Sequence, residues 1–129
     1  MYYAGHKNHK TCNVYRAWSV TDLARDDMAE AVEDAFRYDR LVLATTTYNA
    51  DIFPFMKEFI HHLTERNYQN HTVAFVENGS WAPAAAKVMT RMLEGSKNLT
   101  LCQTTVTLRS ALSDASRAQI TALAEELTK

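Results

Sequence analysis

Short apolar runs alternate with helical stripes along the chain, and this alternation predicts the fold. The unbroken apolar run at 41–44 and the next apolar run, at 72–76, are typical of strands covered on both faces in a parallel sheet. Residues 99–108 supply a third strand. Residues 13–20 are rich in side chains that suit a pleated surface, so we predict a further strand there, near an edge of the sheet.

Four segments carry apolar residues three and four positions apart, which is the spacing of an amphipathic helix. These stripes lie at 28–36, 52–63, 85–93 and 120–127. Side chains that can cap a helix precede each stripe, and the expected caps are Asp26 or Asp27, Asp51, Ser80, and Ser113 with Asp114. Pro54 is compatible with the first turn of the second helix, and Gly95 is the expected stop of the third.

Strands and helices therefore alternate, with short connections, as in right-handed βαβ units of a parallel sheet covered by helices. The 129 residues, 47% of them apolar, suffice for one core, so we predict a single α/β domain over 1–129. Residues 1–12 contain no convincing periodic segment; a very short strand at 1–4 is the only element that they suggest.

The charge balance favours neither nucleic acid nor an anionic membrane as a partner. Fourteen basic and 15 acidic residues give a net charge of −1, without a long run of one sign. No apolar run approaches the roughly 20 residues of a membrane span, and the polar start lacks the apolar centre of a signal peptide. We expect a cytoplasmic protein in which Cys12 and Cys102 form no disulfide framework.

The five histidines do not predict a metal site. His61 and His62 are adjacent, and adjacent helical positions point about 100° apart, so the two cannot share a metal as i, i+4 partners could. His6 and His9 lie among Lys and Asn residues in a segment typical of a solvated chain end.

Two polar loops follow consecutive predicted strands and should lie on the same rim of the sheet. The first comprises Thr45, Thr46, Thr47, Tyr48 and Asn49, and the second Asn78, Gly79, Ser80 and Trp81. Their hydroxyl, amide and aromatic groups suit a flat heteroaromatic ligand that is stacked on its face and hydrogen-bonded at its edge. A purely structural interpretation stays open, in which the threonines satisfy loose backbone groups and the aromatic side chains pack.

The same two loops resemble motifs of the A-type flavoproteins, the flavodiiron family. The motifs are Thr-Tyr-Asn-x-x-x-Phe-Pro-x-Met at 47–56 and Glu-Asn-Gly-Ser-Trp-Ala-Pro at 77–83. The resemblance covers roughly residues 13–128 and implies a flavodoxin-like three-layer sandwich. It also implies that Thr45, Thr47, Tyr48 and Asn49 lie beside the ring of FMN, with 78–81 against its other side. Thr46 stands where the family often has Pro, and Pro83 where Gly is common.

The beginning of the chain departs from that family. A flavodoxin-like domain starts with a strand, a phosphate loop and a helix, a unit of about thirty residues, whereas only 12 residues precede Asn13 here. No hydroxyl-rich run among them matches a phosphate loop. We therefore predict an N-terminally shortened sheet with a gap between 13–20 and 41–47. Direct pairing of those strands, residues 1–4, or a second chain could fill it, and the apolar edge favours a homodimer.

Two functions follow as hypotheses. The first is an FMN-binding electron-transfer module of flavodoxin type, an oxidoreductase component that serves a redox partner protein. The alternative is a truncated or degenerate domain without flavin that serves in assembly or dimerisation. The chain shows no trace of the family's metallo-β-lactamase-like diiron domain, and it lacks a G-x-S-x-G elbow that would favour a hydrolase.

Overall fold

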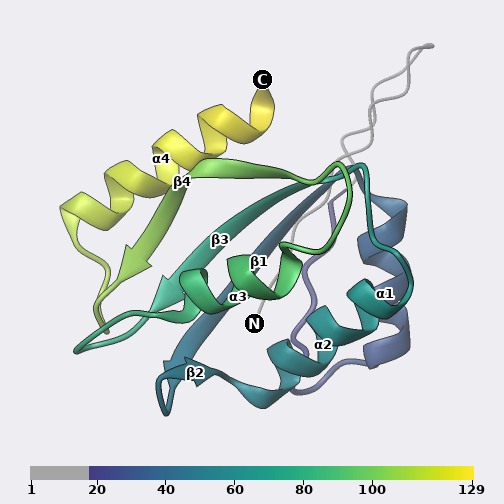
Figure 1. Cartoon of the computed structure of the whole chain (residues 1–129). Coiled ribbons are helices and arrows are strands. Elements are labelled where there is room, and N and C mark those ends of the chain that lie inside the picture. Colours follow the sequence, from purple (N-terminus) through teal and green to yellow (C-terminus); the bar gives the residue numbers. More distant parts are fainter. Residues whose placement is uncertain (1–17) are drawn as a thin grey trace.

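Helices and strands alternate throughout residues 18–129, the part of the chain that the computed structural model describes (Figure 1). In chain order the elements are α1 (Met28–Arg37), β1 (Arg40–Tyr48), β2 (Asp51–Ile52), α2 (Pro54–Glu65), β3 (Thr72–Asn78), α3 (Ala85–Leu93), β4 (Thr100–Leu108) and α4 (Asp114–Thr128). Within these residues, the predicted strands at 41–44, 72–76 and 99–108 and all four predicted helices are present.

The strands form one sheet in the order β2-β1-β3-β4. β1 pairs in parallel with β3, and β3 pairs in parallel with β4, so the arrowheads of these three strands point to one rim (Figure 1). β2 is a two-residue strand, antiparallel to the end of β1. Within the described residues, the outer edge of β1 has a partner only at this end, where Thr47 and Tyr48 face β2.

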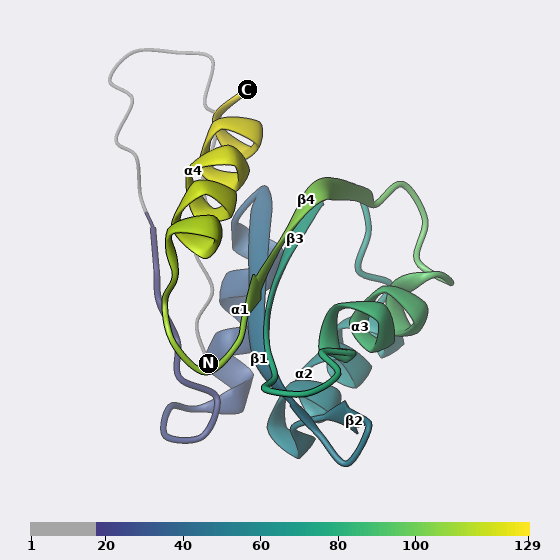
Figure 2. The ribbon, with the colours of Figure 1, turned by 90° about the vertical axis from the view of Figure 1, so that its left-hand side faces the viewer.

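Helices lie on both faces of the sheet, with α2 and α3 on one side and α4 on the other (Figure 2). The larger core joins α1, α2 and α3 to the residues of β1 and β3 that point toward them, such as Leu41, Leu43 and Val73. The smaller core lies under α4 and centres on Ala74, Val106 and Leu123. The sheet is therefore sealed more completely on the α2–α3 face.

The uneven cover is visible along β1. Leu41 and Leu43 are buried, whereas Val42 and Ala44, which alternate with them on the α4 face, are only half-buried. α4 packs chiefly on β4, so it covers the same face of β1 only in part. The run at 41–44 is thus covered fully on one face and partly on the other.

A side chain of α4 hydrogen-bonds the backbone of β4 where the pairing of β4 with β3 is irregular. The register between β3 and β4 shifts between Val73 and Phe75, and the backbone N–H groups of Gln103 and Thr104 donate to the carboxylate of Glu126 at 2.7 and 3.0 Å. These bonds satisfy donors that the irregular ladder leaves unpaired. They also lower the pKa of Glu126, because a carboxylate that accepts N–H bonds is favoured in its charged form.

Of the four expected helix caps, those of α1 and α4 are confirmed, and those at Asp51 and Ser80 are wrong. Asp27 caps α1, and Ser113 caps α4. Asp51 instead belongs to β2, because Asn49 and Ala50 adopt positive φ and turn the chain into a tight hairpin before α2 begins. Lys57 donates to Asp51 at 2.5 Å and lowers the pKa of that carboxyl group.

The predicted strand at 13–20 is not formed where the structure describes it. Trp18, Ser19 and Val20 have no strand conformation, and Trp18 is 71% exposed. The rest of that segment, the short strand suggested at 1–4, His6, His9 and Cys12 lie outside the described residues. Among residues 18–129, no helix has the length and apolar character needed to cross a membrane.

Candidate functional site

The two polar loops lie side by side at the rim where β1 and β3 end. Thr46 and Asn78 are register partners in the parallel ladder, and the Thr46 hydroxyl donates to the Asn78 carbonyl oxygen at 3.2 Å. Gly79 closes the second loop onto the first: a Cβ placed there would lie 3.3 Å from Thr47 Oγ1 and 3.2 Å from the Cα of Pro83. The sequence thus correctly places both loops on one rim.

A pocket of about 410 Å³ opens between the ends of β1, β3 and β4. This volume falls within the range of small-molecule sites. Its apolar lining comes from Ala44, Val76 and Leu108 on the α4 face of the sheet, together with Phe53. Its polar lining is formed by Asp22, Thr45, Thr46, Glu77 and Asn78. Three parallel strands therefore converge on a largely apolar hollow with polar groups at its edge.

Part of the first loop serves the backbone of α3. Thr47 Oγ1 accepts the N–H of Ala84 at 3.0 Å, and Glu77 Oε2 accepts the N–H of Ala86 at 2.8 Å. Ala84 is the N-cap residue of α3 and has no cap of its own. These two strand residues take over the capping role that the sequence suggested for Ser80, which is exposed in the loop.

Asn78 is also committed to the scaffold, since its side-chain oxygen accepts the N–H of Ser110 at 3.0 Å. Together with Thr46 and Thr47 it ties the two loops and the chain after β4 into one unit. For these three residues the structural interpretation of the polar loops holds.

The remaining loop residues are not used in this way. Within residues 18–129 no hydrogen bond engages the side chains of Thr45, Tyr48, Asn49, Ser80 and Trp81. Tyr48 is 50% exposed and contacts Phe53 edge-on, at 5.7 Å between ring centroids. Trp81 is 95% exposed, so it is neither a packing residue nor part of the first turn of α3. These five side chains are the ones available to a ligand.

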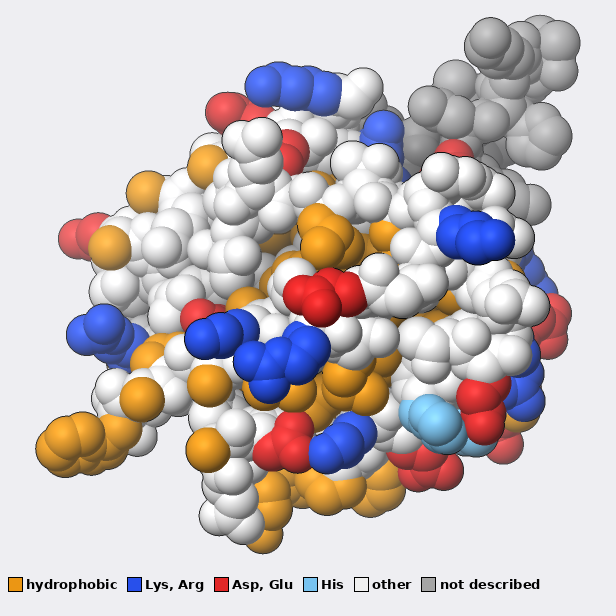
Figure 3. All heavy atoms as spheres, viewed as in Figure 1, with side chains coloured by type: hydrophobic (Ala, Val, Ile, Leu, Met, Phe, Trp, Pro, Cys, Tyr) orange, Lys and Arg blue, Asp and Glu red, His pale blue; other side chains and the backbone are white. Residues whose placement is uncertain are grey.

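Exposed aromatic side chains extend the rim beyond the pocket. Hydrophobic side chains gather along the lower edge of the molecule in Figure 3, over β2 and the start of α2. Tyr48 and Phe55 are exposed there, and Phe53 lies between them at 5.7 Å from each ring. The carboxyl rim therefore carries exposed aromatic side chains beside β2.

Glu77 is a site residue that the sequence did not single out. The residue is buried at 8% exposure and is among those that line the pocket. Its carboxylate accepts the N–H of Ala86 in α3 and the hydroxyl of Thr107, the latter at 3.0 Å. The available signal was a single carboxylate at the end of an apolar strand. Such a group is buried only where hydrogen-bond donors converge on it.

Of the other helix N-termini, those of α1 and α4 are capped by their own residues, whereas α2 has no side-chain cap. Asp27 accepts the N–H of Glu30 at 3.0 Å. α2 begins with Pro54, which has no N–H. Ser113 and Ser116 form a reciprocal capping box on α4. Among residues 18–129, the first turns of α1, α3 and α4 therefore have hydrogen-bond partners within the protein, and the start of α2 is the one without a side-chain cap.

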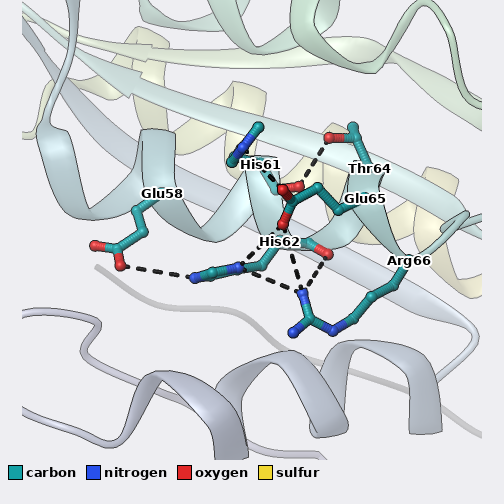
Figure 4. A network of polar contacts seen from close by, with 6 residues as sticks. All are labelled: Glu58, His61, His62, Thr64, Glu65 and Arg66. Atoms are coloured by element: carbon teal, nitrogen blue, oxygen red, sulfur yellow. Dashed lines mark hydrogen bonds and ion pairs between the residues drawn. The ribbon is translucent and has the colours of Figure 1, made fainter.

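The two histidines of α2 belong to a network of polar side chains (Figure 4), none of which lines the pocket at the ends of β1, β3 and β4. His61 lies 3.2 Å from Glu65, whereas His62 lies 3.6 Å from both Glu58 and Glu65. Arg66 completes the network next to His62. Among residues 18–129 no three His, Cys, Asp or Glu side chains form a group that could hold a metal ion.

No protein-family model matches the sequence, and no curated protein does either. Solved structures are similar in fold. Rubredoxin:oxygen oxidoreductase from the anaerobe Desulfovibrio gigas aligns with a TM-score of 0.63 and 16% identity, over 77% of this chain and 31% of that one. The apo form of an NADH:FMN oxidoreductase aligns with a TM-score of 0.56 and 20% identity, over 83% of this chain and 62% of that one.

The chain spans less than two thirds of the length of either structure. At these identities the similarity establishes the fold alone, and that fold is flavodoxin-like, as the resemblance of the two loop motifs implied.

Proposed function

We propose that this chain is an FMN-binding electron-transfer module of flavodoxin type. The observation that carries the proposal is the pocket at the carboxyl ends of β1, β3 and β4, which has exposed aromatic side chains on both adjoining loops, Tyr48 and Trp81. In an open α/β sheet, ligands bind outside the carboxyl ends of the strands. An apolar hollow flanked by aromatic rings and hydroxyl groups suits a flat heteroaromatic ring.

The proposed roles follow from which side chains the scaffold leaves available. Trp81 and Tyr48 would contact the faces of the ring, and Thr45, Asn49 and Ser80 would reach its polar edge. Thr46, Thr47, Asn78 and Gly79 would hold the two loops in place. A bound flavin would supply the redox chemistry, and the chain would supply position and electrostatic environment. No side-chain acid or base is required.

The names of the two similar structures give independent support for redox chemistry on this fold, since both are oxidoreductases and one acts with FMN. Both of those proteins are longer than this chain, so their substrates are not carried over to it. For this chain we propose only the transfer of electrons to or from a redox partner protein, which would meet the aromatic rim where a bound ring would be exposed.

Absorbance spectroscopy of the purified protein, followed by titration of FMN fluorescence, tests the proposal. We expect flavin to bind with quenching of its emission, as happens when the ring stacks on Trp or Tyr. Free tryptophan at the same concentration controls for collisional quenching. A colourless protein that leaves FMN emission unchanged up to saturating protein would refute the proposed function.

A second candidate, a flavin-free domain that serves in assembly as a homodimer, is favoured by the edge of β1. Within the described residues this edge is paired only at its end, and the adjoining face carries the half-buried Val42 and Ala44. Unpaired apolar edges invite association with another strand. Sedimentation velocity over a range of concentrations distinguishes monomer from dimer.

Location in the cytoplasm stays a prediction from the sequence.

A further inference from the structure

We infer that the site recognises the ring of its ligand and not a phosphate group, so that riboflavin and FMN bind alike. The inference rests on the proposed function and specifies the ligand class: a flat, uncharged heteroaromatic ring system. It concerns the pocket at the ends of β1, β3 and β4 and the residues of 18–129 that surround it.

The charges that line the pocket are of one sign. Asp22 and Glu77 are the charged residues of the lining, and no Lys, Arg or His is among them. The Asp22 carboxylate lies 3.7 Å from Arg25, and the Glu77 carboxylate is turned toward the first turn of α3. A phosphate monoester carries a charge of about −1.5 to −2 near pH 7. The lining offers no cation to such a group, and a charge that is buried without a partner costs free energy. A neutral ring meets no such penalty.

The nearest helix N-terminus is already occupied by one of those carboxylates. Glu77 accepts the N–H of Ala86 in the first turn of α3, and Thr47 accepts the N–H of Ala84. This is the position where a bound phosphate would otherwise receive hydrogen bonds and the helix dipole. Glu77 therefore satisfies the anion-binding end of α3 from within the protein.

Parallel titrations of riboflavin and FMN with the whole chain test the inference, at low salt and at about 0.5 M salt. We expect dissociation constants within about threefold of each other, because a phosphate site with two charge-assisted hydrogen bonds would favour FMN roughly a hundredfold or more. Raising the salt should leave both dissociation constants nearly unchanged, because no attraction between a cation and the phosphate is there to be screened.

The outcomes separate the inference from the function on which it rests. Strong preference for FMN, weakened by salt, would overturn the inference and leave the proposed function standing. Failure of both ligands to bind would overturn the proposed function and the inference with it. Similar binding of both would support the two together.

Glu77→Gln provides a second test. Glutamine keeps the size of the side chain, can accept from Ala86 with its oxygen and can donate to Thr107 with its nitrogen, while the charge is removed. We expect FMN to gain severalfold relative to riboflavin in this variant, whereas Glu94→Gln, at the opposite end of α3, should leave the ratio unchanged. An unchanged ratio in folded Glu77→Gln would contradict the role assigned to Glu77.

Discussion

Thr47 Oγ1 accepts the backbone N–H of Ala84 at 3.0 Å, and this bond joins the end of β1 to the start of α3 across 37 residues of sequence. α3 has no cap from its own flanking residues, so Thr47 acts as one. Replacing a hydroxyl cap costs typically about 1 kcal/mol. We expect Thr47→Val to lower the free energy of unfolding by about that amount in urea titrations. Thr47→Ser keeps the hydroxyl and should retain most of the stability; equal losses in both variants would assign the effect to packing.

Replacement of Trp81 should affect ligand binding and not stability, because the proposed function assigns this side chain to the flavin ring. Its side chain is 95% exposed, so we expect Trp81→Ala to leave the unfolding midpoint unchanged. Loss of one stacking ring should weaken flavin binding roughly tenfold, since aromatic pairs contribute about 0.5–1.5 kcal/mol beyond the area they bury. Trp18→Ala removes another exposed tryptophan, outside the pocket, and controls for loss of fluorescence. Equal flavin affinity in the Trp81 and Trp18 variants would remove Trp81 from the site.

The elements that could be predicted from the sequence are those whose signal is local. The apolar stripes of α1 and α2, and the apolar runs of β1 and β3, each depend on burial of one face, and periodicity reports that burial directly. The caps Asp27 and Ser113 could also be predicted, because a cap bonds a backbone N–H only three residues farther along the chain.

The features that the sequence did not predict depend on contacts between distant segments. β2 is too short to show a periodicity and exists because Asn49 and Ala50 adopt positive φ. The expected caps at Asp51 and Ser80 were displaced by that hairpin and by residues of two strands. Glu77 could not be found from local pattern, since its burial depends on donors from α3 and β4.

A side chain at Gly79 should destabilise the protein. A Cβ there would approach the Cα of Pro83 to 3.2 Å, and backbone cannot move away as a flexible side chain can. We expect Gly79→Ala to lower the free energy of unfolding by about 1–3 kcal/mol, as overpacking does, and to separate the two loops of the site. Gly95→Ala is the matched control, because a Cβ at that position meets nothing within 4 Å. Similar unfolding midpoints for the two variants would contradict the close packing of Gly79.

Glu126 should make stability depend on pH. Its pKa is lowered in the folded state by the N–H groups of Gln103 and Thr104. Its contribution is therefore fully present above the unfolded pKa of about 4.3, and it is lost as the pH falls through the lower folded pKa. We expect Glu126→Gln to unfold at lower temperature than the wild type at pH 7, with the difference shrinking at lower pH. Glu125→Gln is the neighbouring control. A difference that stays constant down to pH 2.5 would exclude this origin.

Val42 should report whether the edge of β1 is an interface between two copies of the chain. It is half-buried on the α4 face beside the edge that lacks a partner along most of its length in the described residues. If the proposed dimer forms there, Val42→Lys places a charge in the interface of both copies, and charged edge residues oppose strand pairing. We expect the wild type to sediment as a dimer and the variant as a folded monomer, with circular dichroism confirming that the helices remain. Ile120→Lys makes the same change at a 44% exposed position of α4 and should leave the dimer intact. A wild type that is monomeric at every concentration would refute the dimer, and loss of the dimer in the Ile120 variant alone would move the interface to α4.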